Sequence, residues 1–273
     1  MPAVDSLQLV TDVVAERANG VNAGFFNGIE QEWRQRVQQY INAAGSPAMV
    51  TTWAAAQARK TSFLSLYLAP AENSVQGRML SAMRQHELTV CPACGELGRP
   101  NTLDHYLPKR LYPQFCVTPA NLFPMCDACQ LAKGEKVGDA RTPRFFIHPY
   151  FDAFVAEQVL RLEIHAPFDA PTFTLGLVEG LGPSKARLVR SHMRELEIEK
   201  RYAGFFRNQH RRLLRLVDAM RVAGQDVQQT LTTFKHGATE PSLNTWEHVF
   251  YAAAIDNPDL IDYLTNAQLP QYL

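Results

Sequence analysis

Residues 91–133 read CPACGELGRPNTLDHYLPKRLYPQFCVTPANLFPMCDACQLAK and contain two Cys-x-x-Cys pairs, Cys91 with Cys94 and Cys126 with Cys129. Each pair fits on one turn of chain and directs two sulfur atoms toward a common point. Four thiolates saturate a tetrahedral Zn²⁺ and leave no open position for a substrate, so the predicted zinc is structural. Redox chemistry is the less favoured alternative, because two pairs are present and no thioredoxin-like βαβ pattern surrounds them.

An acidic residue and an imidazole stand side by side between the two pairs, as Asp104-His105 in an apolar, strand-like segment. Neighbouring side chains of a strand point to opposite faces. If the strand bends here, Asp104 can hold a divalent cation while His105 accepts a proton from an attacking water. The sequence therefore offers a hydrolytic centre inside the zinc-bound loop.

The order of these motifs resembles the zinc-containing branch of the HNH endonucleases over residues 88–140: Cys-x-x-Cys, Asp-His-x-x-Pro-Lys, Asn-Leu, then Cys-x-x-Cys-x-x-x-Lys. The phrases at 104–109, 112–115 and 148–152 are also similar to bacterial HNH proteins found with mobile elements and phage defence. The resemblance implies a ββα-metal motif in which Asp104 binds the catalytic metal and His105 is the general base. It also implies that the Asn121 amide fixes the loop that holds His105.

The last motif position, directly after the final zinc cysteine, usually carries His or Asn as a second protein ligand of the catalytic metal. Here it is Gln130. A Gln amide oxygen can bind a hard cation, but it lies one methylene farther out and loses more rotamer freedom when fixed. Three interpretations stay open: Gln130 binds with adjusted geometry, Asp127 helps, or the centre is weakened. Oxygen ligands favour Mg²⁺ or Mn²⁺ as the catalytic metal.

Basic side chains near the motif and in a later helix are candidates for contacts to phosphates. Lys109, Arg110 and Lys133 flank the centre, with solvated surface charge as an equal alternative. Residues 200–215 contain six Lys or Arg, among them Arg207 and Arg211, and no acidic residue. Such a helix face can neutralise several phosphates, although charged helix faces are more often only solvated.

The remaining sequence predicts a mostly helical α+β protein in which helices flank the zinc motif. Apolar residues recur at helical spacing in Ile29–Ala44, Ala48–Leu68 and Ala71–Leu88. Two strands are expected at Val159–His165 and Thr172–Val178. Strongly helical sequence follows from residue 184 to 222, and the chain after it predicts one or two further helices.

Composition is that of an ordinary globular protein, and 27 basic residues balance 27 acidic ones, so attraction to nucleic acid must come from local patches. No stretch approaches the ~18 apolar residues of a membrane-spanning helix, and no basic-then-apolar leader is visible. We therefore expect a cytoplasmic protein that does not enter a membrane. We divide it into an N-terminal helical region, 1–87, the zinc motif, 88–150, and a C-terminal region, 151–273.

Together these patterns favour a metal-dependent HNH endonuclease that cuts DNA, with structural Zn²⁺ and catalytic Mg²⁺ or Mn²⁺. The resemblance alone favours DNA over RNA, and it further implies a phage-defence effector that works beside an ATPase partner protein. The alternative is an HNH zinc module with a weakened centre, acting as a nucleic-acid- or protein-binding adaptor. Gln130 is the sequence feature that supports this alternative.

Overall fold

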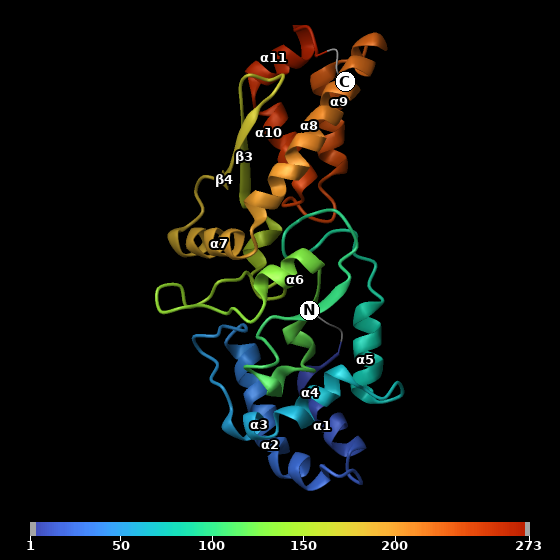
Figure 1. The fold of residues 1–273 in the computed structure, drawn as a ribbon, viewed down its shortest axis with the longest axis vertical. Coiled ribbons are helices and arrows are strands. Elements are labelled where there is room, and N and C mark those ends of the chain that lie inside the picture. The colour runs from blue at the N-terminus through green and yellow to red at the C-terminus, as the bar shows by residue number, and fades with distance from the viewer. Residues whose placement is uncertain (1–3, 271–273) are drawn as a thin grey trace. The chain divides into compact units, whose positions relative to one another are not determined.

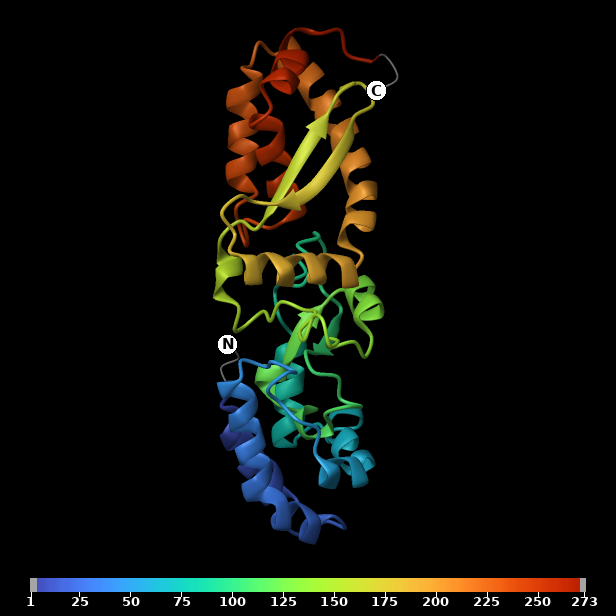
Figure 2. The same ribbon diagram turned by 90° about the vertical axis from the view of Figure 1, so that its left-hand side faces the viewer.

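The computed structural model describes residues 4–270, and its contacts divide the chain into two compact units. The first unit consists of the chain up to Ala93 together with Arg99–Ala153, and the second of Cys94–Gly98 together with the chain from Phe154. Many helices and two small two-stranded sheets confirm the mostly helical α+β class (Figures 1 and 2). No helix among residues 4–270 is both long and apolar enough to cross a membrane.

Helices of the first unit pack around an aromatic core. The rings of Trp33 and Phe63, both fully buried, meet edge to face with centroids 5.0 Å apart, the geometry that aromatic quadrupoles favour. The indole N–H of Trp33 donates to the carbonyl of Gln114 at 2.7 Å, which joins the helices to the loop of the zinc motif. The helices are α1 (Ser6–Glu16), α2 (Ala23–Asn42), α3 (Ala54–Ala58), α4 (Lys60–Leu68) and α5 (Val75–Arg84).

The single helix predicted over Ala48–Leu68 is wrong in its first part. Residues 48–53 are not helical, and the helical sequence is divided into α3 and α4 at Arg59. Trp53 lies in this non-helical segment and is buried. The guanidinium of Arg36 lies 4.9 Å from the centroid of its ring. Burial of this side chain has overridden the local helix propensity.

The zinc motif folds as two strands followed by a helix. Strands β1 (Thr102–His105) and β2 (Leu122–Met125) pair antiparallel, with Asp104 opposite Phe123 and His105 opposite Leu122. Helix α6 (Asp127–Lys133) begins two residues after β2, in the expected ββα order. Two short 3-10 turns, η1 (Pro113–Phe115) and η2 (Pro119–Asn121), lie in the connection between the strands.

The second unit places a hairpin against a bundle of helices (Figure 2). Strands β3 (Leu160–His165) and β4 (Thr172–Leu177) pair antiparallel, which confirms the expected strand pair. Alternate residues of β3, Leu160, Leu162 and Ile164, are buried, and the strand packs on α10. The helices are α7 (Pro183–Glu195), α8 (Ile198–Val222), α9 (Val227–Gly237), α10 (Trp246–Ile255) and α11 (Pro258–Asn266), and a short turn, η3 (Ala153–Ala156), precedes the hairpin.

Two details of this region differ from the sequence-based expectation. The helical stretch 184–222 is broken between α7 and α8, where Glu197 takes the left-handed conformation with φ of 52°. Leu196 and Ile198, on either side of this residue, are both buried, so the turn allows the two helices to direct both side chains inward. Three helices rather than one or two follow α8 in the described chain.

Candidate metal centre

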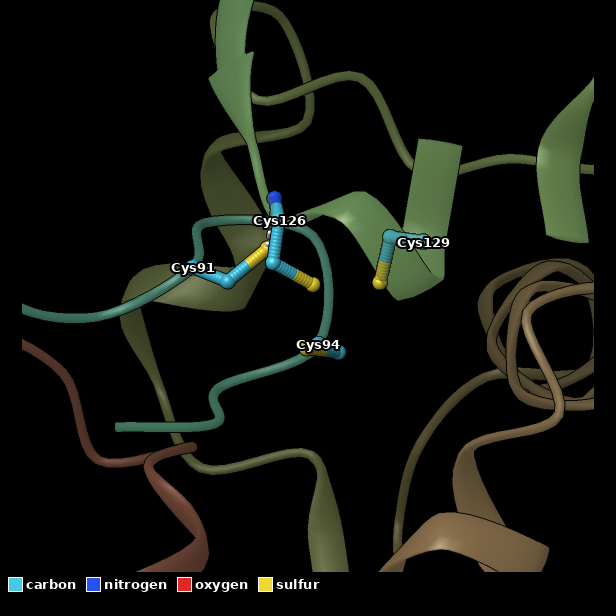
Figure 3. Close-up of side chains that lie close together, drawn as sticks. All are labelled: Cys91, Cys94, Cys126 and Cys129. Atoms are coloured by element: carbon cyan, nitrogen blue, oxygen red, sulfur yellow. Dashed lines mark hydrogen bonds between the residues drawn. The ribbon is translucent and has the colours of Figure 1, made fainter. Parts of the chain in front are cut away.

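The four cysteines of the two Cys-x-x-Cys pairs form one cluster (Figure 3). Their sulfur atoms all lie within 4.8 Å of one another, and none of the four is in a disulfide. Zinc–sulfur bonds of ~2.3 Å separate the sulfurs of a tetrahedral site by ~3.8 Å, so a small inward movement closes this cluster on an ion. The cluster therefore fits a metal ion with four thiolate ligands, and structural zinc is the ion that suits this donor set.

Backbone geometry explains how each pair presents its sulfurs. Cys126 is the N-cap residue of α6 and Cys129 lies in its first turn, where backbone N–H groups have no partner within the helix and favour thiolates. The backbone N–H of Cys126 points at the sulfur of Cys91, with 3.4 Å between nitrogen and sulfur. At the other pair, the indole N–H of Trp246 donates to the carbonyl of Cys94 at 2.6 Å.

Asp104 is buried near the end of β1, and each of its two carboxylate oxygens lies close to a different side chain of α6. Nε2 of Gln130 lies 3.4 Å from Oδ1, and the ammonium of Lys133 lies 3.0 Å from Oδ2. Lys133 also donates to the carbonyl oxygen of His105 at 2.6 Å. Burial lowers the pKa of Lys133, and the charge of Asp104 opposes this shift. The structure thus brings Gln130 and Lys133 of α6 to the carboxylate of Asp104, and Lys133 also to the backbone carbonyl of His105.

His105 is 2% exposed, and its ring orientation follows from one hydrogen bond. Nε2 lies 2.9 Å from the carbonyl oxygen of Cys116, which can only accept, so Nε2 carries the proton and Nδ1 is the basic nitrogen. Burial, followed by the positive charge of Lys109, lowers the pKa of His105 to about 3. The imidazole is therefore neutral at pH 7, and at this pKa it accepts a proton far less readily than a histidine that titrates near neutrality.

Asn121 closes the loop between the two strands. Its side chain is fully buried; Oδ1 accepts from the N–H of Leu107 at 2.7 Å, and Nδ2 donates to the carbonyls of Leu107 and Phe115 at 3.1 and 3.2 Å. Phe115 directly precedes Cys116, whose carbonyl orients His105. Asn121 thus holds the loop that carries the carbonyl against which His105 is oriented.

Tyr67 on α4 packs against His105, although its sequence position placed it in the helical scaffold. Its ring packs edge-on against His105 with centroids 4.4 Å apart, and its hydroxyl donates to the carbonyl of Leu103 at 2.5 Å. The ammonium of Lys109 lies 5.3 Å from the centroid of the same ring. No local pattern around Tyr67 signals this role, because its partners come from a segment more than thirty residues later.

The segment 148–152, in which His148 is buried, forms hydrogen bonds to Tyr40 of α2 and to β2. Nε2 of His148 lies 2.8 Å from the hydroxyl of Tyr40, and Nδ1 accepts from the N–H of Tyr150 at 3.2 Å. The hydroxyl of Tyr150 donates to the carbonyl of Leu122 in β2 at 2.8 Å, and Asp152 accepts from the N–H of His148. Both ring nitrogens of His148 are thus engaged within the protein, and Tyr150 connects the segment to β2.

The predicted phosphate contacts fall into different environments. Lys109 is partly exposed, whereas Arg110 is exposed and forms a 3.4 Å ion pair with Glu135. The expectation that Lys133 lies at the surface is wrong: it is 1% exposed and is bound to Asp104 and the His105 carbonyl, so it cannot reach a phosphate. Arg207 and Arg211 are exposed on α8 of the second unit.

Comparison with known proteins adds one partial match. A 62-residue stretch is 40% identical to the protein ea31 of Escherichia phage lambda and covers 23% of this chain and 21% of that protein. No protein-family model matches the chain, and no solved structure matches it. The match spans about a fifth of the phage protein, so it relates a segment and not the whole chain.

Proposed function

We propose that this protein is a metal-dependent endonuclease of the HNH type that hydrolyses phosphodiester bonds in DNA. The observations that support the proposal are the contact of Asp104 with Gln130 and, at the next residue of β1, His105 with its Nε2 on the Cys116 carbonyl. Asp104 and His105 lie on β1, and Gln130 directly follows Cys129 of the four-thiol cluster on α6. A carboxylate, an amide and an imidazole are groups that suit hydrolysis assisted by a hard cation.

The residues divide the chemistry between them. Nδ1 of His105 accepts the proton of the attacking water, while the Cys116 carbonyl holds the ring in the required tautomer. Asp104 Oδ1 and the Gln130 amide would hold Mg²⁺ or Mn²⁺, with water and phosphate oxygens as further ligands. A half-turn of the Gln130 amide directs its oxygen to the place where the nitrogen now lies. The cation, when bound, supplies neutralisation of charge on the scissile phosphate and the leaving oxygen.

His105→Ala tests this assignment. Purified protein is incubated with supercoiled plasmid and Mg²⁺ or Mn²⁺, and zinc content is measured on the same sample. Loss of a general base lowers the rate by about 10²- to 10⁴-fold, while zinc content and helical signal stay unchanged. His165→Ala, at an exposed histidine on the hairpin, is the matched control and keeps the wild-type rate. Nicking by His105→Ala at the control rate would contradict the proposal.

An exposed arginine stripe on α8 supports DNA as the substrate. Arg207, Arg211 and Arg215 are spaced by four residues, which places them on one helix face, and all three are exposed. None of the three has an acidic partner within 4.0 Å among residues 4–270, whereas nearby Arg194 and Lys200 form ion pairs with Glu195 and Glu197. Unpaired guanidinium groups in a row are available to phosphates.

The salt dependence of binding tests this surface apart from catalysis. Each phosphate contact adds about 0.9 to the slope of log affinity against log salt concentration. The double variant Arg207→Ala, Arg211→Ala should therefore lower the slope for duplex DNA by about 1.8. Arg161→Ala removes an exposed arginine that already pairs with Glu179 at 2.8 Å, and it should leave the slope unchanged. If the wild type, the double variant and Arg161→Ala all gave the same salt-dependence slope, Arg207 and Arg211 would not contact DNA phosphates.

The second candidate is a zinc-stabilised binding module with a weakened centre. The orientation of Gln130 favours it, because an amide nitrogen directed at Asp104 forms a hydrogen bond and not a metal site. Gln130→Asn, which restores a shorter amide, separates the candidates. A higher nicking rate supports the nuclease, whereas absence of cleavage by both proteins with Mg²⁺, Mn²⁺, Ni²⁺ or Zn²⁺ supports the binding module.

A role in phage defence beside an ATPase partner belongs to the same proposal. It is supported by the resemblance to HNH proteins found with mobile elements and phage defence. Co-purification of a tagged chain from its native cells tests the partner. An ATPase that co-purifies in equal amount supports the role, and the chain recovered alone speaks against it.

A further inference from the structure

Lys133 is a lysine whose charged end is entirely inside the first unit. The residue is 1% exposed, and its ammonium lies 2.6 Å from the His105 carbonyl, 3.0 Å from Asp104 Oδ2 and 5.8 Å from the centroid of the Phe146 ring. Burying an ammonium costs several kcal/mol, which one carboxylate only partly offsets. A methionine of similar length would fill the same space without this cost, so stability alone does not explain the lysine.

The arrangement of α6 shows what the ammonium does. Gln130 and Lys133 are three residues apart and therefore lie on the same helix face. That face meets the carboxylate of Asp104, with Gln130 at Oδ1 and Lys133 at Oδ2. Oδ2 is buried, and the Lys133 ammonium at 3.0 Å is its neighbour of opposite charge. A cation approaching from the Gln130 side meets Oδ1 alone.

We propose that Lys133 sets the ion preference of this centre by reserving one oxygen of Asp104, so that the carboxylate binds a cation through Oδ1 only. The inference rests on the proposed catalytic metal at Asp104 and Gln130. Mg²⁺ requires nearly ideal octahedral geometry at 2.0–2.1 Å, which one-oxygen ligation suits. Ca²⁺ accepts six to eight ligands at longer distances and readily takes both oxygens of a carboxylate. Lys133 is in this sense a positioning residue that favours Mg²⁺ over Ca²⁺.

The test is the ratio of two dissociation constants, measured by calorimetry for Mg²⁺ and Ca²⁺ on zinc-loaded protein. Removing a positive charge strengthens binding of both divalent ions equally, so the charge effect cancels in the ratio and the change in ligation does not. Lys133→Met should shift the ratio toward Ca²⁺ by about ten- to a hundredfold, the range in which partners of metal ligands act. Lys136→Met, at an exposed lysine three residues later, should leave the ratio unchanged.

A shift in the ratio of less than twofold in folded, zinc-loaded Lys133→Met would overturn the inference while leaving the nuclease proposal intact. Wild-type protein that binds neither ion would overturn both. If the variant fails to fold, nuclear magnetic resonance of the Lys133 ammonium in the wild-type protein provides a second test. A buried ammonium exchanges its protons slowly, and its signal should persist when Mg²⁺ saturates the centre. Loss of that signal on saturation would mean that the cation displaces Lys133, which is the opposite of the inference.

Discussion

Replacing Asn121 by alanine should destabilise the first unit by about 3 to 4 kcal/mol. The side chain makes three hydrogen bonds, one to the Leu107 N–H and two to the carbonyls of Leu107 and Phe115, and all three residues are fully buried. A hydrogen bond contributes about 0.5–1.5 kcal/mol net, and each backbone group left without a partner keeps the cost of its desolvation. Three bonds sum to about 1.5–4.5 kcal/mol, and the unpaired buried backbone groups place the loss in the upper part of that range. Such a loss is a large part of the roughly 5–15 kcal/mol typical of a folded domain.

The assay is urea unfolding of zinc-loaded protein, followed by circular dichroism and by tryptophan fluorescence. Two compact units can unfold in separate steps, so the transition of the first unit is fitted on its own. Asn101→Ala is the matched control, because this exposed amide has a single 3.2 Å bond to Asp127 and its loss should cost less than about 0.5 kcal/mol. A loss below about 1 kcal/mol for Asn121→Ala would refute the view that this amide holds the loop.

Two further predictions concern titration and the metal. Burial, with a smaller contribution from the charge of Arg144, lowers the pKa of His148 to about 3, whereas an unfolded histidine titrates near 6.5. The unfolded chain therefore takes up a proton that the folded chain refuses, and stability falls by about 1.4 kcal/mol per pH unit as the pH drops from 6.5 toward 3. In His148→Gln, the free energy of unfolding obtained from urea titrations should lose this pH dependence of about 1.4 kcal/mol per unit. An unchanged slope of that free energy against pH would contradict the assignment. Cys129→Ser should lose zinc and lower the melting temperature of the first unit, while Cys116→Ser, at a buried cysteine outside the cluster, should keep one zinc per chain.

The parts of the centre that sequence could predict are those in which chemistry depends on spacing within a short segment. Two Cys-x-x-Cys pairs carry their own geometry, because each pair needs only one turn to direct two sulfurs inward. The cluster of four sulfurs within 4.8 Å confirms this prediction. The proximity of Asp104 to Gln130 was expected from the same motif, although sequence alone left the orientation of the amide open.

Long-range partners decided the features that sequence could not predict. Lys133 ends a short helix of mixed composition, and both interpretations of its charge placed it in solvent. Its burial depends on Asp104, which lies on a strand almost thirty residues earlier. Tyr67 looked like one more apolar residue of a scaffold helix, yet its ring covers His105. In both cases the deciding neighbour is distant in the chain, so no local pattern could indicate the role.

Helix α6 connects the structural and the proposed catalytic parts of the motif within seven residues. Cys129 directs its sulfur to the thiol cluster, while Gln130 and Lys133 direct their polar atoms to Asp104. A shift of the helix by one residue would move each side chain by about 1.5 Å along the axis and 100° around it, which is enough to break all three contacts. Zinc bound at Cys126 and Cys129 would fix both the register and the rotation of α6. A zinc site at the four cysteines would therefore affect the proposed Asp104 centre without touching it, because it would determine which side chains of α6 can reach the carboxylate.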